Sequence, residues 1–146
     1  MKRRLLLSLL LALLPSLALA AVTWTNSTVF TGGVATNYHS AAILSDGSGN
    51  ASGAVYMHGF LVTALVTPGA DAAAPDTGWD CTLAGPYGGD VMGAALTNLG
   101  TATGAPYKPL DRGGSSIFER VDGSYTLSCT GMGAANTATI LFAVQE

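Results

Sequence analysis

Hydrophobic and polar residues alternate most clearly in two stretches of the chain. In residues 79–83 the large apolar side chains are Trp79, Cys81 and Leu83, and the residues between them are Asp80 and Thr82. In residues 124–130 the corresponding set is Tyr125, Leu127 and Cys129, and every residue between them is Ser or Thr. Strand side chains alternate between two faces, so this pattern predicts two half-buried β-strands. We expect these two strands to form the centre of an all-β domain.

Other short segments of strand-like composition follow one another along the chain, with turn residues between them. They cover residues 22–24, 28–30, 40–45, 51–57, 60–67, 117–121 and 137–144, with 90–93 as a shorter candidate. Asp-Gly and Gly-Asn pairs within residues 46–50 and at Asp122-Gly123, and the pair Pro68-Gly69, predict turns. Residues 94–98 are compatible with one helical turn, and residues 99–114 form the longest irregular connection.

This spacing predicts the fold class. About eight short strands, spaced about 8–12 residues apart, indicate a single antiparallel β-sandwich or a jelly-roll-like domain. A parallel α/β fold is excluded because the sequence contains no crossover helices between the strands.

The first twenty residues have the three parts of a secretory signal peptide. Lys2 to Arg4 are basic, Leu5 to Leu14 are apolar, and Ala18-Leu19-Ala20 is a small-residue cleavage site. The apolar segment is too short to span a bilayer. We therefore predict a signal peptide over residues 1–20, a β-sandwich domain over residues 21–146 and an extracytoplasmic location, either secreted or periplasmic.

Removal of the signal peptide changes the charge of the chain. Three of the six cations are lost, and Lys108, Arg112 and Arg120 remain against nine acids, a net charge of −6. An acidic protein with three cations has no basic patch for nucleic acid or anionic lipid. Only 10% of the chain is charged, whereas a designed soluble surface carries about 25–35% charged residues. This neutral surface predicts that part of the protein is covered by a partner.

Cys81 and Cys129 are the only cysteines, and each lies on the apolar face of its strand. In an oxidising compartment such a pair is expected to form a disulfide. The alternative is two buried free thiols that never meet, because free cysteine is itself commonly buried. The disulfide, if formed, supports the extracytoplasmic location.

The sequence contains no recognisable active site, metal site or cofactor motif. His39 and His58 lack the additional ligands of a metal site, and we expect both to lie at the surface or in turns. The loop that begins at Asp46 has Met57 where a calcium loop requires Glu, which favours a plain hairpin. Four carboxylates could supply a glycosidase pair, although their positions beside turns favour turn-capping roles: Asp71, Asp76, Asp80 and Asp90. We therefore predict a protein that is not an enzyme.

The edges of the predicted sheet have little protection against pairing with other chains. Natural edge strands are commonly protected by Lys, Pro or bulges, and the candidate edges here contain no Lys. We predict self-association or binding of a protein partner, through residues 22–30 or residues 137–144.

From Pro75 to the C-terminus the chain resembles small β-sandwich structural proteins encoded in tailed-bacteriophage genomes. The residues that carry the resemblance are 75–83, the Gly89–Gly93 turn, Asn98, and segments of the closing hairpin and final strand at 117–118, 121–123, 126–127 and 139–142. The resemblance covers about half of the mature chain. It implies a virion-associated structural protein with no catalytic residues. A protein that assembles into virions in the cytoplasm has no need of a signal peptide, so the predicted signal peptide is a departure from this family.

Two other functional classes stay open. A secreted bacterial surface module, such as a pilin-like or adhesin-like domain, has a glycine near the C-terminus, as Gly133 is here. Gln145 stands where a pilin has an aromatic residue, and the cysteines are placed differently. A small secreted hydrolase is the third alternative, and it would require one Asp or His to be essential for activity.

Overall fold

The computed structural model describes residues 19–102, 104 and 106–146, so most of the predicted signal peptide lies outside the described residues. The predicted all-β class is confirmed, because the described elements are six β-strands and one short 3₁₀ helix. The elements are β1 (Ala21–Thr31), β2 (Val34–Leu44), β3 (Ala51–Pro68), η1 (Asp71–Ala73), β4 (Asp80–Ala84), β5 (Glu119–Thr130) and β6 (Thr137–Gln145). The first strand begins at Ala21, the residue predicted to begin the mature chain.

The strands form one antiparallel sheet in the order β1-β2-β6-β3-β5-β4. This arrangement differs from the predicted sandwich of eight short strands. Several short strands predicted next to one another in the sequence are joined into single long strands, which form one sheet. The predicted turn at Asp122-Gly123 lies inside β5, where Asp122 pairs with His58 and Gly123 pairs with Met57. Pairing with a long neighbouring strand therefore overrides the local turn preference of these residues. The predicted strand at residues 90–93 is only an isolated bridge from Asp90 to Ala84, followed by turns.

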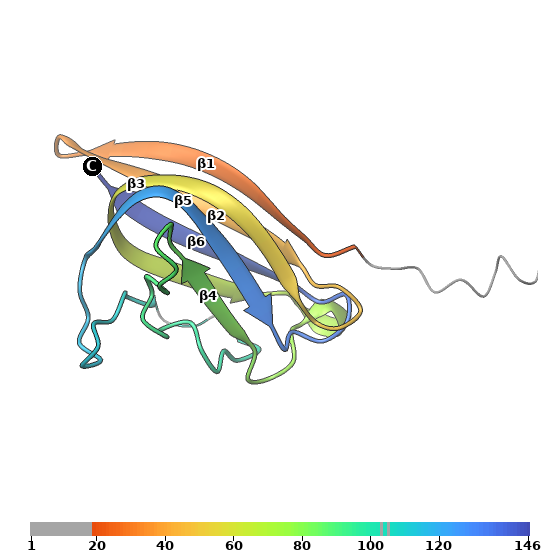
Figure 1. Cartoon of the computed structure of the whole chain (residues 1–146). Helices are drawn as coiled ribbons and strands as arrows, with labels where there is room; N and C mark the ends of the chain where they lie inside the picture. Colours follow the sequence, from red (N-terminus) through yellow and green to blue (C-terminus); the bar gives the residue numbers. More distant parts are fainter. Residues whose placement is uncertain (1–18, 103, 105) are drawn as a thin grey trace, which may run out of the picture.

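β3 is the longest strand and joins two halves of the sheet. Its first part pairs with β5, and its second part, from Phe60 onward, pairs with β6 with a register irregularity between Leu61 and Thr63. Figure 1 shows the resulting strong bend of the sheet. The bend brings the start of β1 against β3, where a Cβ atom on Gly53 would lie 2.7 Å from Cβ of Val22. A larger residue than glycine at position 53 would push these two strands apart.

The core lies on the inner face of the bent sheet. The predicted apolar faces of residues 79–83 and 124–130 are confirmed, since their large apolar side chains are all buried. Their predicted central place is wrong, because β4 is an edge strand and the middle of the sheet is formed by β6 and β3. The connection from β4 to β5 folds beneath the sheet (Figure 1) and adds three fully or almost fully buried residues to the core, Met92, Leu96 and Leu99. Within the described residues, no helix is long and apolar enough to cross a membrane.

The two cysteines form the predicted disulfide. Cys81 of β4 and Cys129 of β5 are direct partners in the strand register, and their Cα atoms are 4.1 Å apart. The backbone N–H of Cys81 donates to the carbonyl of Leu96 and therefore points away from β5. Such a non-hydrogen-bonded pair is the closer of the two kinds of antiparallel pair, which places the two side chains within bonding reach.

Candidate functional site

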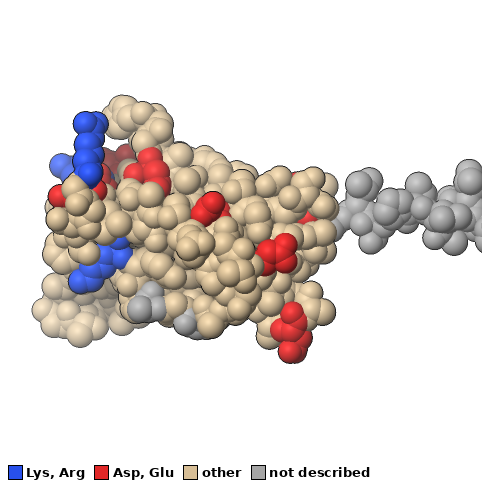
Figure 2. Space-filling model, turned by 90° about the horizontal axis from the view of Figure 1, so that it is seen from below, with Lys and Arg blue, Asp and Glu red and all other residues tan. Residues whose placement is uncertain are grey.

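Charged residues are separated from most of the sheet. The four neighbouring strands β1, β2, β6 and β3 contain no Asp, Glu, Lys or Arg over their combined length. The charged residues of the sheet are those of β4 and β5. Figure 2 shows that the Lys and Arg side chains gather at one end of the molecule, whereas the acids are spread along its length. The molecule therefore has a neutral side, formed by these four strands, and one end at which its cations gather.

The two edges of the sheet are protected to different degrees. β4 is five residues long, and the segment that follows it covers its outer side. Three backbone hydrogen bonds make this cover: Cys81 N–H to Leu96 at 2.8 Å, Leu99 N–H to Trp79 at 2.8 Å, and Val91 N–H to Leu83 at 2.9 Å. β1 is eleven residues long and pairs only with β2 among the described strands. An uncharged open edge of this length is a template for pairing with another strand.

The second half of β1 is exposed on both faces. Residues 25–31 are all exposed, and they include Val29 at 48% and Phe30 at 76% of their full accessible surface. In β2, Val34 is 43% exposed on the other arm of the same hairpin. Isolated exposed apolar residues are ordinary, but here Val29 and Val34 share the outer face of one uncharged hairpin and Phe30 lies exposed on its inner face, so both faces offer apolar surface to a partner.

The exposed apolar surface continues beyond the hairpin. A hollow of about 370 Å³ is lined by Val34, Phe60, Val62, Phe118, Gln145 and Glu146. Phe60 and Phe118 are themselves 51% and 66% exposed. The hairpin that carries β1 and β2 therefore adjoins an apolar hollow at the end of the molecule.

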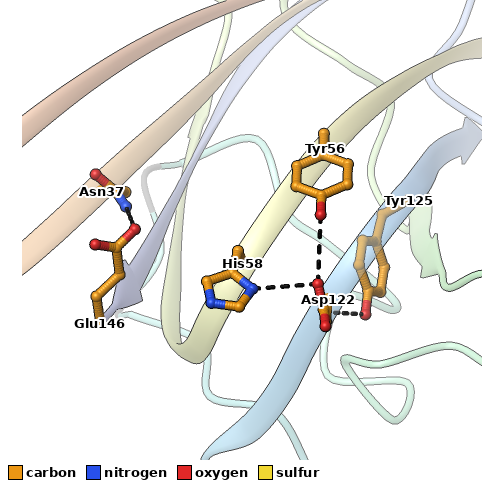
Figure 3. A network of polar contacts seen from close by, with 6 residues as sticks. All are labelled: Asn37, Tyr56, His58, Asp122, Tyr125 and Glu146. Atoms are coloured by element: carbon orange, nitrogen blue, oxygen red, sulfur yellow. Dashed lines mark hydrogen bonds and ion pairs between the residues drawn. The ribbon is translucent and has the colours of Figure 1, made fainter.

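A cluster of polar side chains lies near this hollow on β3 and β5 (Figure 3). Nδ1 of His58 is 3.1 Å from Oδ1 of Asp122, its direct partner in the strand register. The Tyr56 hydroxyl donates to the same carboxylate oxygen at 3.4 Å, and the backbone N–H of Asp122 donates to the Tyr125 hydroxyl at 3.0 Å. The side chains of His58 and Tyr56 therefore converge on the Asp122 carboxylate at the outer face.

The environment of Asp122 lowers the pKa of its carboxyl group. The hydrogen bond from His58 is the largest cause, partial desolvation opposes it, and the nearby charges of His58 and Arg120 and the Tyr56 hydroxyl add to the lowering. The side chains of His58 and Asp122 are 59% and 53% exposed. An ion pair this exposed contributes little to stability.

The His58–Asp122 pair has one feature of a catalytic dyad, because an aspartate orients the imidazole. Figure 3 shows the other ring nitrogen, Nε2, turned away from Asp122. Among the described residues, no hydroxyl or thiol forms a hydrogen bond with this nitrogen. His58 and Asp122 therefore form a cross-strand polar pair and not a complete set of nucleophile, base and acid.

A larger groove lies on the charged side of the same end. It has a volume of about 680 Å³ and is lined by the turn at residues 85–91, the loop at residues 110–117 and β5. Tyr87 in this lining is fully exposed, and Arg112, Glu119 and Asp122 contribute charges of both signs. The groove can therefore offer an aromatic surface and polar partners to a ligand.

The four carboxylates considered for catalysis have different contacts. Asp90 accepts hydrogen bonds from the backbone N–H groups of Leu83, Met92 and Ala94 at 3.0, 3.1 and 2.9 Å. Asp80 accepts from the N–H of Asn98 at 2.6 Å. Asp71 begins the 3₁₀ helix, and Asp76 lies beside Gly133. Asp90 thus has the predicted turn-capping role, whereas Asp80 accepts from a residue 18 positions further along the chain.

The loop at residues 46–50 is a turn, but the predicted hairpin is wrong, because the two strands that it joins, β2 and β3, are separated by β6 in the sheet. Oδ1 of Asp46 accepts hydrogen bonds from the N–H groups of Ser48 and Asn50 at 2.8 and 2.9 Å. Within the described residues, no group of three or more His, Cys, Asp or Glu side chains is arranged to hold a metal ion.

The expectation that both histidines lie at the surface or in turns is wrong for His39 and is met by His58. His39 lies in β2 and is only 7% exposed, and its Nδ1 is 3.0 Å from Oδ1 of Asn26 in β1. Burial lowers the pKa of His39. His58 is exposed as expected, but it lies inside β3 and not in a turn.

Sequence reasoning identified β1 correctly and missed the polar cluster. The predicted edge at residues 22–30 is an edge strand, but the alternative edge at residues 137–144 is β6, which lies between β2 and β3. The cluster was missed because His58-Gly59 and Asp122-Gly123 both have the composition of turns. The alternation of Tyr56, His58 and Phe60 was the available signal for a continuous strand.

Comparison with known proteins gives no relative: no family model, no curated protein and no solved structure matches the chain. The comparisons therefore link the chain to no family, and the resemblance to phage structural proteins stays a prediction.

Proposed function

We propose that this chain is a non-enzymatic structural protein of an extracytoplasmic assembly, which binds its neighbour through the open edge of β1. The observation that carries the proposal is the contrast between the two edges. β4 is short and covered by a following segment, whereas β1 is eleven residues long, uncharged and paired with a strand on one side only, with contact to β3 at its start. Monomeric proteins protect such an edge against pairing, so an unprotected edge favours a role in pairing with a strand of another chain.

The neutral side of the molecule supports the same function. The four strands next to one another from β1 to β3 contain no charged residue, and the exposed Val29, Phe30 and Val34 lie on the hairpin that includes the open edge. Pairing of β1 with another strand would satisfy its outward backbone groups and cover these apolar side chains.

The disulfide is compatible with an oxidising compartment and so supports the extracytoplasmic part of the proposal. Two settings fit a protein of this kind. The likeness of residues 75–146 to phage-encoded proteins supports a virion-associated one, and the signal-peptide pattern supports a bacterial surface module. A hydrolase is disfavoured because Asp80 and Asp90, two of its candidate carboxylates, are occupied by backbone N–H donors.

The test is to follow assembly of the full chain, with its own N-terminal segment, in the organism that produces it. Thr25 and Ser27 are exposed residues of β1, and the double variant Thr25→Lys/Ser27→Lys adds charge at the open edge. Thr82→Lys is the matched control, because Thr82 is an exposed threonine on the covered edge strand. Sedimentation of the exported material, followed by intact mass, measures how much of the protein is in large complexes.

We expect the wild-type chain and Thr82→Lys to sediment in a complex and the β1 double variant to be released as single chains. Added Lys side chains are the device by which natural edge strands prevent pairing. Assembly of the β1 variant to the wild-type extent would refute the proposed role of the edge.

A further inference from the structure

We infer that the strand which pairs with β1 is β1 of a second copy of this chain, antiparallel to the first and centred on Asn26. This inference rests on the proposed function, in which the edge of β1 is the docking site. It adds the identity of the partner and the register of the pairing.

The register follows from the two faces of β1. Even-numbered residues from 22 to 30 share the inner face with the buried side of β2, and odd-numbered residues from 21 to 31 share the outer face. Opposite residues of an antiparallel pair lie on the same face, so even residues must pair with even ones. Centring the pair on Asn26 is the one choice that brings all eleven residues of both strands opposite each other.

In this register the apolar residues of β1 find complementary partners. Phe30, which is 76% exposed, lies opposite Val22 of the second copy, and Val22 is already partly covered by Gly53. Val29 lies opposite Thr23, and Thr25 lies opposite Ser27. Aromatic residues opposite β-branched residues are favourable cross-strand pairs, and Thr–Ser pairs can form hydrogen bonds.

Charge and preorganisation also favour a second copy. β1 contains no charged residue, so two copies meet without repulsion, and a two-fold pairing forms a closed dimer. The strand is already held in its paired shape by bonds to β2, Asn26 with His39 at 3.0 Å and Thr28 with Asn37 at 2.6 Å. Little order therefore has to be gained on association, which reduces its entropic cost.

The first experiment is sedimentation velocity of the purified mature chain. We expect a concentration-dependent dimer, and we expect Thr25→Lys/Ser27→Lys to weaken it by at least about tenfold, because the register brings the added positive charges directly opposite each other. Thr82→Lys should leave the dimer unchanged. A wild-type chain that stays a monomer at high concentration would refute the second copy as partner.

The second experiment tests the register by cross-linking under mild oxidation. Thr25→Cys and Ser27→Cys are prepared as separate variants of different mass, both with the native disulfide retained. We expect the equimolar mixture to form a covalent heterodimer, because these positions lie opposite each other, and each variant alone to form much less homodimer. Efficient homodimer from Ser27→Cys alone, or from Thr25→Cys alone, would place the centre one residue away from Asn26 and refute the register.

The two proposals fail in different ways. A monomeric purified chain that still needs an uncharged β1 edge for assembly in its producing organism would refute self-pairing and leave the proposed function standing. Normal assembly of the Thr25→Lys/Ser27→Lys variant in that organism would refute the proposed function itself.

Discussion

Removal of the disulfide tests how the small, charge-poor domain is stabilised. Cys81 and Cys129 are 48 residues apart in sequence, and the bond between them closes a loop that includes the whole irregular connection from β4 to β5. In the chain-entropy model a loop of this length loses about 14 cal/mol/K in the unfolded state, or about 4 kcal/mol at 25 °C. For a domain of this size that corresponds to a fall in Tm of about 15 °C.

The assay is urea unfolding of the wild-type chain, the two single Cys→Ala variants and the double variant. Either single substitution breaks the bond, so we expect all three variants to lose about the same stability, near 4 kcal/mol. The two single effects should therefore not add in the double variant. A cycle in which they add, or a double variant within about 1 kcal/mol of the wild type, would refute the view that this bond restricts the unfolded chain.

Three further predictions concern single residues. The lowered pKa of His39 means that the unfolded chain binds a proton more readily than the folded chain. The contribution of His39 to stability should therefore be complete above about pH 6.5 and should fall as the pH drops below that value. A His39→Gln variant with the same acid dependence in thermal melts would contradict this. Asp90→Ala should cost about 2–4 kcal/mol in urea unfolding, because three backbone N–H groups lose their acceptor, and Asp90→Asn, which keeps one carbonyl oxygen, should cost clearly less. Ile140→Lys should prevent folding, because Ile140 is fully buried in a central strand. Ile140→Val should cost only about 0.5–1.5 kcal/mol in urea unfolding. An Ile140→Lys protein that is folded by circular dichroism would contradict the strand order.

The sequence by itself determined the features that depend on neighbouring residues. Alternation over two residues fixed which side chains of 79–83 and 124–130 are buried, and it placed both cysteines on buried faces. The turn-capping of Asp46 and Asp90 was predictable because each carboxylate bonds to N–H groups only a few residues away, apart from the bond to Leu83. The absence of charge along β1 was also visible without any structure.

The tertiary structure decided everything that depends on which strands lie side by side. A local pattern gives the faces of a strand but not its neighbours, so the central position of β6 and the edge position of β4 could not be read from the chain. The continuity of β3 and β5 has the same origin, because pairing of His58 with Asp122 holds two turn-like dipeptides in extended strands. Burial of His39 and exposure of the β1 edge follow from the order of the strands in the sheet. The first property is the basis of the expected acid sensitivity, and the second is the basis of the proposed dimer.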